Sequence, residues 1–463
     1  MTAGVLQENK VKGENIFGQI PVLKAVLLMA IPTVVSQLIS VLYNIADTWF
    51  LGVTENTAAV AAVSLCLPLY VMMAAFANLF GIGGASVIAR ALGEENKQKA
   101  QKAFKVSIIG SLIFSVIYAL ILIVFSNKIL MLIGGDAENI QYAYNYTLIT
   151  IIIGSIPTII SMTLAHLIRA TGQSKIASFG MVLGAVLNIA LDPLFMFVIF
   201  SPGSELIGAS IATLLSNVIS FIFFVVYITL SKNEIFKLKQ EKNNEKVILD
   251  ILKCGAASFC LKGISMISNC FLNGMLTSLG ASSAMAGIGI TRKIDSVAYA
   301  INQGITQGML PIVSYCYASK KYDRMKKVII ISAAMTMGFS VLWALMSYIF
   351  APYLIEFFIN DLEVITLGTK FLRILCIAVA IYPLLFVLIT VFQAVGDSAK
   401  PFILALLHKG IDIAIFFLVR SVWGVEYILY VAPTMDLIAL IIAIILYLKR
   451  FSRNNLNIKK NPL

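Results

Sequence analysis

The chain has 463 residues, of which 59% are hydrophobic and only 13% are charged. Soluble globular proteins carry about 25% charged residues, so these values exclude a soluble protein and indicate one that crosses the membrane many times. The net charge of +12 would also suit a protein that binds nucleic acid, but the placement of the charges argues against RNA or DNA as a partner.

A helix that crosses the hydrocarbon core needs about 20 largely apolar residues. Measured against this length, the chain predicts twelve spans. The first apolar run is too long for a secretory signal, so we expect it to be the first transmembrane helix. In chain order the predicted spans are 21–51, 56–84, 100–126, 138–168, 175–200, 204–231, 247–279, 282–311, 323–350, 353–392, 399–420 and 425–449.

Lysine and arginine concentrate in alternate connections between the predicted spans, most densely in 90–105, 232–253 and 320–327. Because basic residues stay on the cytoplasmic side of a membrane protein, this bias places both termini in the cytoplasm. We therefore expect a multi-pass protein of the cell inner (cytoplasmic) membrane. Its predicted extramembrane parts are a cytoplasmic N-terminal segment at 1–20, a linker at 232–246 and a cytoplasmic tail at 450–463.

The two halves of the chain repeat one another at a spacing of about 225 residues. RATGQS at 169–174 matches QAVGDS at 393–398, and GDAEN matches NDLEV. Each half holds six spans, so the copies insert in the same orientation and are related by an axis along the membrane normal. The predicted fold is an all-α integral membrane protein with twelve transmembrane helices. They form two six-helix bundles with pseudo-twofold symmetry, at 21–231 and 247–449. Such a layout favours an alternating-access carrier.

Asp47 lies in an apolar run, where a charged group costs about 3 kcal/mol on insertion scales. In the fifth predicted span Asn188 and Asp192 share one helix face, and Thr213 lies in the sixth. If the bundle brings these residues together, they form an all-oxygen site that could hold a hard cation such as Na+. Two nearby acids also repel one another when ionised, which favours uptake of a proton. Alternatively, Asp192 caps a helix break at Pro193, while Asn188 and Thr213 bond to neighbouring backbones.

The second half lacks this acid, because the repeat aligns Asp47 with Met275. It carries other polar residues within or near its apolar spans, namely Lys262, Arg292, Lys293, Asp295, His408, Lys409, Asp412 and Asp436. We expect His408 and Asp412, four residues apart, to bond. A basic cavity lined by such residues would suit substrates that carry acidic or hydrogen-bond-accepting groups. The alternative is that they form local salt bridges that hold helices together.

The candidates for the substrate cavity come from both halves. They are Tyr43 and Asn44, one turn before Asp47, and Arg292, Asp295, His408, Lys409 and Asp412 in the second half. Pro32 lies in the same span as Asp47 and is the proline at which we expect a bend coupled to ion loading.

The sequence contains no GxxxxGK[ST] nucleotide loop, no HExxH or GxSxG motif and no cysteine–histidine metal cluster. We therefore expect neither enzymatic activity nor a bound cofactor. The six cysteines are interpreted as small residues of membrane helices, and GIGGAS at 81–86 as a helix-packing motif.

Several motifs resemble the multidrug and toxic compound extrusion (MATE) family, in its bacterial DinF-like and MepA-like branch. They are SQLISVLYNIADTWFLG, GGASVIARALGEENKQKA, RATGQSKIAS followed by NIALDPLF, GASIAT and FQAVGDSAKP. The resemblance covers about 20–448. It implies export of organic, often cationic and aromatic, compounds in exchange for H+ or Na+ as the coupling ion.

By this resemblance Asp47, Asn188, Asp192 and Thr213 match the cation site of that branch, and Pro32 matches the proline at which its first span bends. The chain departs from the family at LALLHKG, where His408 and Lys409 replace a common Arg-Gln pair.

The nearest alternative function is a flippase for a lipid-linked precursor in the related superfamily, which the basic residues of the second half favour. A channel and a membrane-embedded enzyme are further alternatives. We expect a monomer in the lipid bilayer that acts on a small organic substrate.

Overall fold

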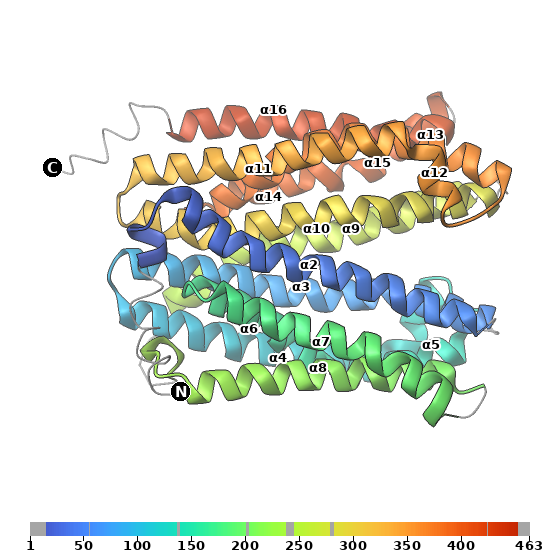
Figure 1. Cartoon of the computed structure of the whole chain (residues 1–463), viewed down its shortest axis with the longest axis horizontal. Coiled ribbons are helices and arrows are strands. Elements are labelled where there is room, and N and C mark those ends of the chain that lie inside the picture. The colour runs from blue at the N-terminus through green and yellow to red at the C-terminus, as the bar shows by residue number, and fades with distance from the viewer. Residues whose placement is uncertain are drawn as a thin grey trace.

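The computed structural model describes residues 15–54, 56–136, 139–200, 203–237, 245–277, 282–423 and 425–451. Its long helices run side by side along one axis and form two bundles, the first half of the chain below the second in Figure 1. The predicted N-terminal segment and tail lie largely outside the described residues, and so does the middle of the predicted linker, 238–244. The limits of these segments stay predictions.

The first bundle contains six helical segments. They are α2 (Val22–Val53), α3 (Thr57–Gly93), α4 (Lys97–Leu132), the chain of α5 (Ile140–Tyr146), η1 (Thr147–Ile153) and α6 (Ser155–Ala170), α7 (Ser174–Leu194) with η2 (Phe195–Ile199), and α8 (Glu205–Leu230). A bend of 49° separates η1 from α6. A short turn of 3-10 helix, η3 (Glu234–Phe236), follows α8 and packs against α4.

The second bundle repeats this order. It consists of α9 (Glu245–Thr277), α10 (Ser282–Ala318), α11 (Tyr322–Ile349), α12 (Ala351–Glu356) with α13 (Leu362–Ala394), α14 (Ala399–Ala405) with η4 (Leu406–Gly410) and α15 (Asp412–Val422), and η5 (Val425–Tyr430) with α16 (Val431–Phe451). The predicted single span 353–392 is wrong in one respect, because the chain leaves the helix between Glu356 and Leu362. Asp361 then caps α13 by accepting hydrogen bonds from the backbone N–H groups of Glu363 and Val364.

Each of the twelve predicted spans coincides with one of these segments. Within the described ranges, nine helices are long and apolar enough to cross a membrane, and the bent pair α5–η1 and α6 adds a tenth. α9 and α10 are not among these ten, and they carry Lys262, Arg292, Lys293 and Asp295 among their apolar residues. α3, α4 and α10 extend beyond the predicted limits.

The duplication predicted from the sequence is visible in the backbone. Glu95 and Lys320, about 225 residues apart, both have positive φ angles, of 56° and 60°. Gly172 and Gly396, in the matched RATGQS and QAVGDS turns, have φ angles of 85° and 80°. Positive φ angles are uncommon for residues other than glycine. Their recurrence at equivalent positions shows that the two halves of the chain end the corresponding helices in the same backbone conformation.

The two halves meet along two equivalent helix pairs, α3 with α9 and α2 with α10. A Cβ atom on Gly83 would lie 2.2 Å from the carbonyl oxygen of Ile251, and one on Gly308 would lie 2.8 Å from the Cα of Ala30. Gly83 and Gly308 are themselves equivalent in the repeat. Small residues allow membrane helices to approach this closely, so the GIGGAS segment serves helix packing, and the expected pseudo-twofold arrangement of two six-helix bundles is confirmed.

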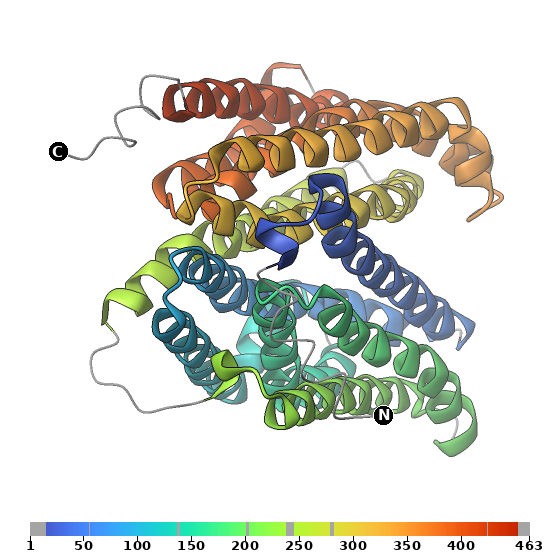
Figure 2. The ribbon, with the colours of Figure 1, turned by 60° about the vertical axis from the view of Figure 1, so that its left-hand side comes forward.

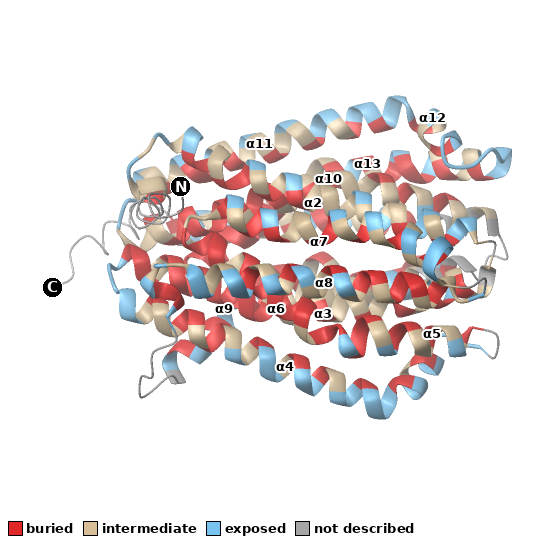
Figure 3. Cartoon of the chain, turned by 60° about the horizontal axis from the view of Figure 1, so that its bottom comes forward, coloured by how far each residue is buried: buried red, intermediate tan, exposed pale blue. Residues whose placement is uncertain are grey.

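The outward faces of the bundles are apolar, as a lipid environment requires. Side chains such as Ile113, Leu120 and Val124 of α4 and Leu342 and Leu345 of α11 are exposed. In Figure 3 the exposed residues follow the outer faces of α4, α8 and α11, while the buried residues face the neighbouring helices. Figure 2 shows the two bundles from another side, with α2 beside the second bundle.

Candidate ion site and central cavity

The structure brings three of the predicted ion-site residues into direct contact and places the fourth on the neighbouring helix. Asn188 of α7 donates one hydrogen bond to the Asp192 carboxyl, 3.2 Å away, and another to the Thr213 hydroxyl of α8, 3.1 Å away. Asp47 lies on α2, which packs against α7. The Asn188 amide and the Thr213 hydroxyl therefore bond to each other and not to neighbouring backbones, as the alternative interpretation had it. The helix continues through Asp192 and Pro193 to Leu194, so Asp192 does not cap a helix break at Pro193.

Three oxygens of this cluster have no hydrogen-bond partner among the described residues. They are Asp47 Oδ1, Asn188 Oδ1 and Asp192 Oδ2, all of them buried. Asp47 is only 8% exposed. A buried carboxylate without a partner is costly, and oxygen ligands of this kind suit a proton or a hard cation. The donor set thus fits H+ or Na+ chemically.

A central cavity of about 310 Å³ lies between the two bundles. Tyr43, Asn44, Asn188 and Thr213 line it, as the sequence analysis expected for the first two. Asp47 and Asp192 do not line it themselves, so the acid cluster borders the cavity through Asn188 and Thr213. From the second half the cavity receives Lys262, Tyr299, Ala300, Gln303 and Gln307.

The five second-half candidates lie elsewhere. Arg292, Asp295, His408, Lys409 and Asp412 are not among the described residues that line the central cavity. His408 donates from Nδ1 to Asp436 Oδ1 at 2.5 Å, Lys409 pairs with Asp412 at 3.6 Å, and Asp295 accepts a hydrogen bond from the Tyr382 hydroxyl at 3.4 Å. The contacts of His408 and Asp295 join different helices, in line with the alternative interpretation, whereas the pair of Lys409 and Asp412 lies within one helical segment.

The predicted bond between His408 and Asp412 is wrong. Residues 406–410 form η4, a turn of π-helix, and His408 is turned toward α16, where it meets Asp436, 28 residues further along the chain. Asp412 pairs with Lys409 instead. Spacing within one helix cannot anticipate a contact with another helix.

Of the basic residues that reach the cavity, sequence reasoning named Lys262 but missed Arg169. The predicted span 138–168 ends before Arg169, but this residue lies in the last turn of α6 and is 4% exposed. Its Nη1 contacts His166 Nδ1 at 3.3 Å and Gln307 Oε1 at 3.4 Å. The signal in the sequence was the pair of His166 and Arg169, three residues apart at the end of an apolar run.

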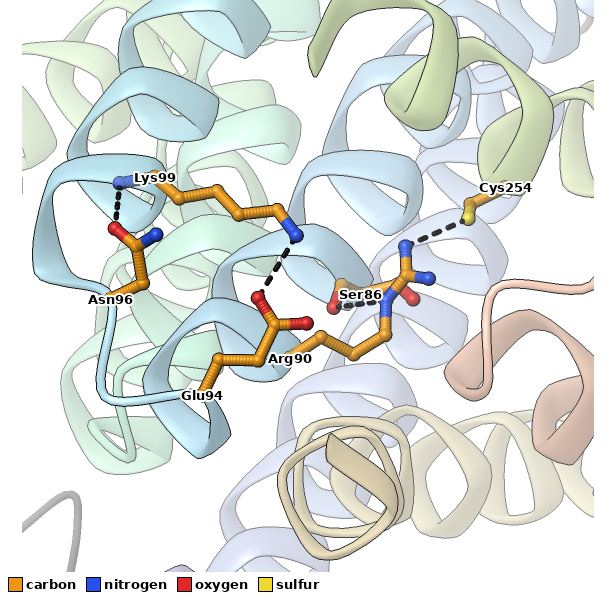
Figure 4. A network of polar contacts seen from close by, with 6 residues as sticks. All are labelled: Ser86, Arg90, Glu94, Asn96, Lys99 and Cys254. Carbon is orange, nitrogen blue, oxygen red and sulfur yellow. Dashed lines mark hydrogen bonds and ion pairs between the residues drawn. The ribbon is translucent and has the colours of Figure 1, made fainter. Parts of the chain in front are cut away.

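A second set of contacts joins the two halves near the end of α3 (Figure 4). The Ser86 hydroxyl donates to the backbone carbonyl of Gln393 at 2.7 Å, and Arg90 Nη2 contacts Cys254 Sγ of α9 at 3.3 Å. The guanidinium of Arg90 also lies against Gly396, where a Cβ atom would be 1.7 Å from Nη1. These contacts close the boundary between the bundles at the end of α3.

Two equivalent bundles of membrane helices around a polar cavity, with a buried acid cluster beside it, define a membrane transport protein. The chain belongs to the MatE family, whose model matches residues 32–194 and, a second time, residues 254–418. The double match reflects the internal repeat, and the family resemblance of the motifs is confirmed. The protein is a multi-pass membrane transporter and not an enzyme.

Curated relatives match over nearly the whole chain. The Multidrug export protein MepA of Staphylococcus haemolyticus (strain JCSC1435) is 27% identical over 453 residues, which cover 96% of this chain and 97% of the relative. The Multidrug export protein MepA of Staphylococcus aureus (strain NCTC 8325 / PS 47) is 28% identical over 440 residues, which cover 94% and 95%. The chain is thus MepA-like, as the sequence motifs predicted.

Solved structures share the fold. A MATE protein crystallised in complex with MaD3S has a TM-score of 0.89 at 22% identity, over 98% of this chain and 100% of that one. An outward-facing multidrug resistance MATE family transporter of the MOP superfamily has a TM-score of 0.88 at 22% identity, over 96% and 98%. A MOP superfamily transporter from Pyrococcus furiosus, described as having a binding pocket of reverse polarity, has a TM-score of 0.88 at 21% identity, over 98% and 100%.

Proposed function

We propose that this protein is an antiporter that exports drugs or other organic, often amphipathic, compounds across the cytoplasmic membrane in exchange for inward H+ or Na+. The observation that carries the proposal is the buried acid cluster beside the central cavity, with three oxygens that lack protein partners. Two of its members, Asn188 and Thr213, also line the cavity. The two MepA relatives, named multidrug export proteins, support export as the direction of transport.

The coupling follows from the position of the cluster. One H+ or Na+ that enters from outside neutralises one of the two negative charges of Asp47 and Asp192, which removes the repulsion between two buried like charges. Relief of this repulsion changes the packing of α2 on α7, and we place the bend at Pro32, which lies inside α2. Ion and substrate need only bias the same two-state equilibrium, with a coupling of about 1–3 kcal/mol.

The orientation is part of the proposal. We place both termini, and the end of the bundle where α3 and α10 finish, in the cytoplasm, because the basic connections gather there. The contacts of Ser86 and Arg90 would then form the cytoplasmic gate, which opens when the carrier turns inward to bind the next substrate. We propose that one chain, without nucleic acid or a bound cofactor, completes this cycle.

The test is transport into inverted vesicles energised by an H+ or Na+ gradient, using Asp47→Asn. The change preserves shape and removes the titratable charge, so we expect gradient-driven transport to fall at least tenfold. Asp323→Asn, an exposed acid at the start of α11, is the matched control and should transport like the unchanged protein. Unimpaired transport in Asp47→Asn would sink the proposal. Counterflow driven by a pH jump or by a Na+ jump then identifies the ion.

A further inference from the structure

The residues that line the central cavity include two full positive charges and no negative one. Arg169 and Lys262 lie in its wall together with His166, and the remaining polar groups are amides, hydroxyls and tyrosines. An adjoining pocket of about 50 Å³ shares Arg169, His166 and Lys262 with it. Within the described part of the chain, no aspartate or glutamate lines either space.

Arg169 is a buried cation without an acidic partner. It is 4% exposed, and among the described residues its Nε atom has no hydrogen-bond partner and Nη1 meets the neutral acceptors His166 and Gln307. The carbonyl end of α6 offsets part of its charge. A buried guanidinium normally sits opposite a carboxylate, since the cost of removing it from water is otherwise not recovered. The positive charge that Arg169 brings to the cavity wall is therefore not balanced by any described carboxylate.

Lys262 presents the second charge from α9. Its Nζ lies 5.1 Å from the centre of the Tyr299 ring, and no described carboxylate pairs with it. A ring face attracts an ammonium group but does not neutralise it. Because Lys262 belongs to the second half and Arg169 to the first, the two cations face the same space from opposite bundles.

We propose that the central cavity binds organic anions, with a carboxylate, sulfonate or phosphate held by Lys262 and Arg169. The aromatic rings of Tyr43, Tyr70 and Tyr299 in the same wall would hold the apolar part of the molecule. This inference rests on the proposed function and names the substrate class of the same cavity.

The charge of the substrate constrains the coupling. Loading of the acid cluster with a cation makes its surroundings less negative and so favours an anion nearby. Direct attraction between the bound cation and the anion would therefore produce cotransport. Antiport of an anion requires that coupling run through movement of α2 and not through repulsion between ion and substrate.

The test is equilibrium binding to the purified full chain in detergent, without any gradient, followed by fluorescence polarisation. The probes are carboxyfluorescein, an anion, and rhodamine 6G, a cation with a similar ring system. We expect the anion to bind at least tenfold more tightly. Tighter binding of the cation, equal binding of both dyes, or binding of neither up to its solubility limit would overturn the proposal.

Variants locate the effect. Lys262→Gln should weaken binding of the anion at least fivefold, and Lys262→Arg, which keeps the charge, should restore most of it. Arg169→Gln should also weaken binding of the anion. Because Arg169 is buried and its loss could impair folding, the affinities of the Lys262 variants are the decisive measurement. Lys128→Gln removes an exposed charge from α4, away from the cavity, and should change nothing. An unchanged affinity in Lys262→Gln would contradict the assignment.

Competition distinguishes two sources of the anion. Displacement of the dye by a soluble aromatic sulfonate points to an exported solute, and displacement by phosphatidic acid micelles points to a lipid acid; either agrees with an anionic site. Failure of gradient-driven uptake alongside a retained preference for the anion would overturn the antiport proposal and leave the charge class intact.

Discussion

Gly255 of α9 lies directly against the backbone of Leu79 in α3, so that a methyl group on Gly255 would sit 1.8 Å from the Leu79 carbonyl oxygen. The obstructing atom belongs to the backbone, and no side-chain rotation can relieve the overlap. We expect Gly255→Ala to destabilise the protein by about 1–3 kcal/mol through overpacking, measured as a lower thermal unfolding midpoint in detergent. Gly263→Ala, on the same helix with nothing within 4 Å of the added methyl, is the control. Equal midpoints for the two variants would contradict this account of the contact.

Arg90 contacts residues of the second half of the chain, whereas Lys99 contacts a residue of its own half. Arg90 contacts Cys254 and Gly396 in the second half, whereas Lys99 pairs with Glu94 at 3.0 Å within the first (Figure 4). We therefore expect Arg90→Ala to open the proposed cytoplasmic gate more often.

The measurement is maleimide labelling of Cys254, which is buried, in a variant whose other five cysteines are replaced. The labelling rate should rise several-fold with Arg90→Ala and remain unchanged with Lys99→Ala. A rate that does not respond to Arg90→Ala would show that these contacts are not a barrier to opening.

The pair of His408 and Asp436 holds η4 against α16. Replacement of His408 by Phe leaves a buried Asp436 without its donor, and we expect a loss of about 1–3 kcal/mol of stability. The double variant His408→Phe with Asp436→Leu should recover part of that loss, because two apolar groups need no partner. Unfolding midpoints of both variants check this. A double variant less stable than His408→Phe would mean that the aspartate has another role in the fold.

Thr213 supports the ion site through its hydroxyl. Thr213→Val keeps the shape of the side chain but removes the acceptor for the Asn188 amide, so the cluster loses one of its two internal hydrogen bonds. We expect the concentration of H+ or Na+ that gives half-maximal transport to rise about threefold to tenfold. Ser210→Ala, whose hydroxyl bonds only to the Leu206 carbonyl of its own helix, should leave that concentration unchanged. An unaltered ion dependence in Thr213→Val would remove Thr213 from the site.

The membrane spans could be predicted because the free energy of placing a helix in lipid depends on contiguous residues. The same reasoning singled out Asp47, since one acid in an apolar run is costly wherever the helix lies. The repeat was also legible in the chain, because matched turns such as those of Gly172 and Gly396 keep their residue types.

Contacts between helices could not be predicted in this way. His408 was paired with Asp412 by regular spacing, but it contacts Asp436 on another helix. The predicted span 138–168 ends before Arg169, although α6 continues far enough to bury it beside Gln307 of the other half.

The sequence by itself determined the membrane class, the two-fold repeat and the acids in apolar spans that we propose bind an ion or a proton, because hydropathy and local spacing carry that information. Only the tertiary structure decided which polar residues share the cavity. That grouping depends on how α3 packs against α9 and α2 against α10, and on where each helix ends. Arg169 and Lys262, 93 residues apart in the chain, face one space for this reason, and the positive charge of that space is a property of the packing.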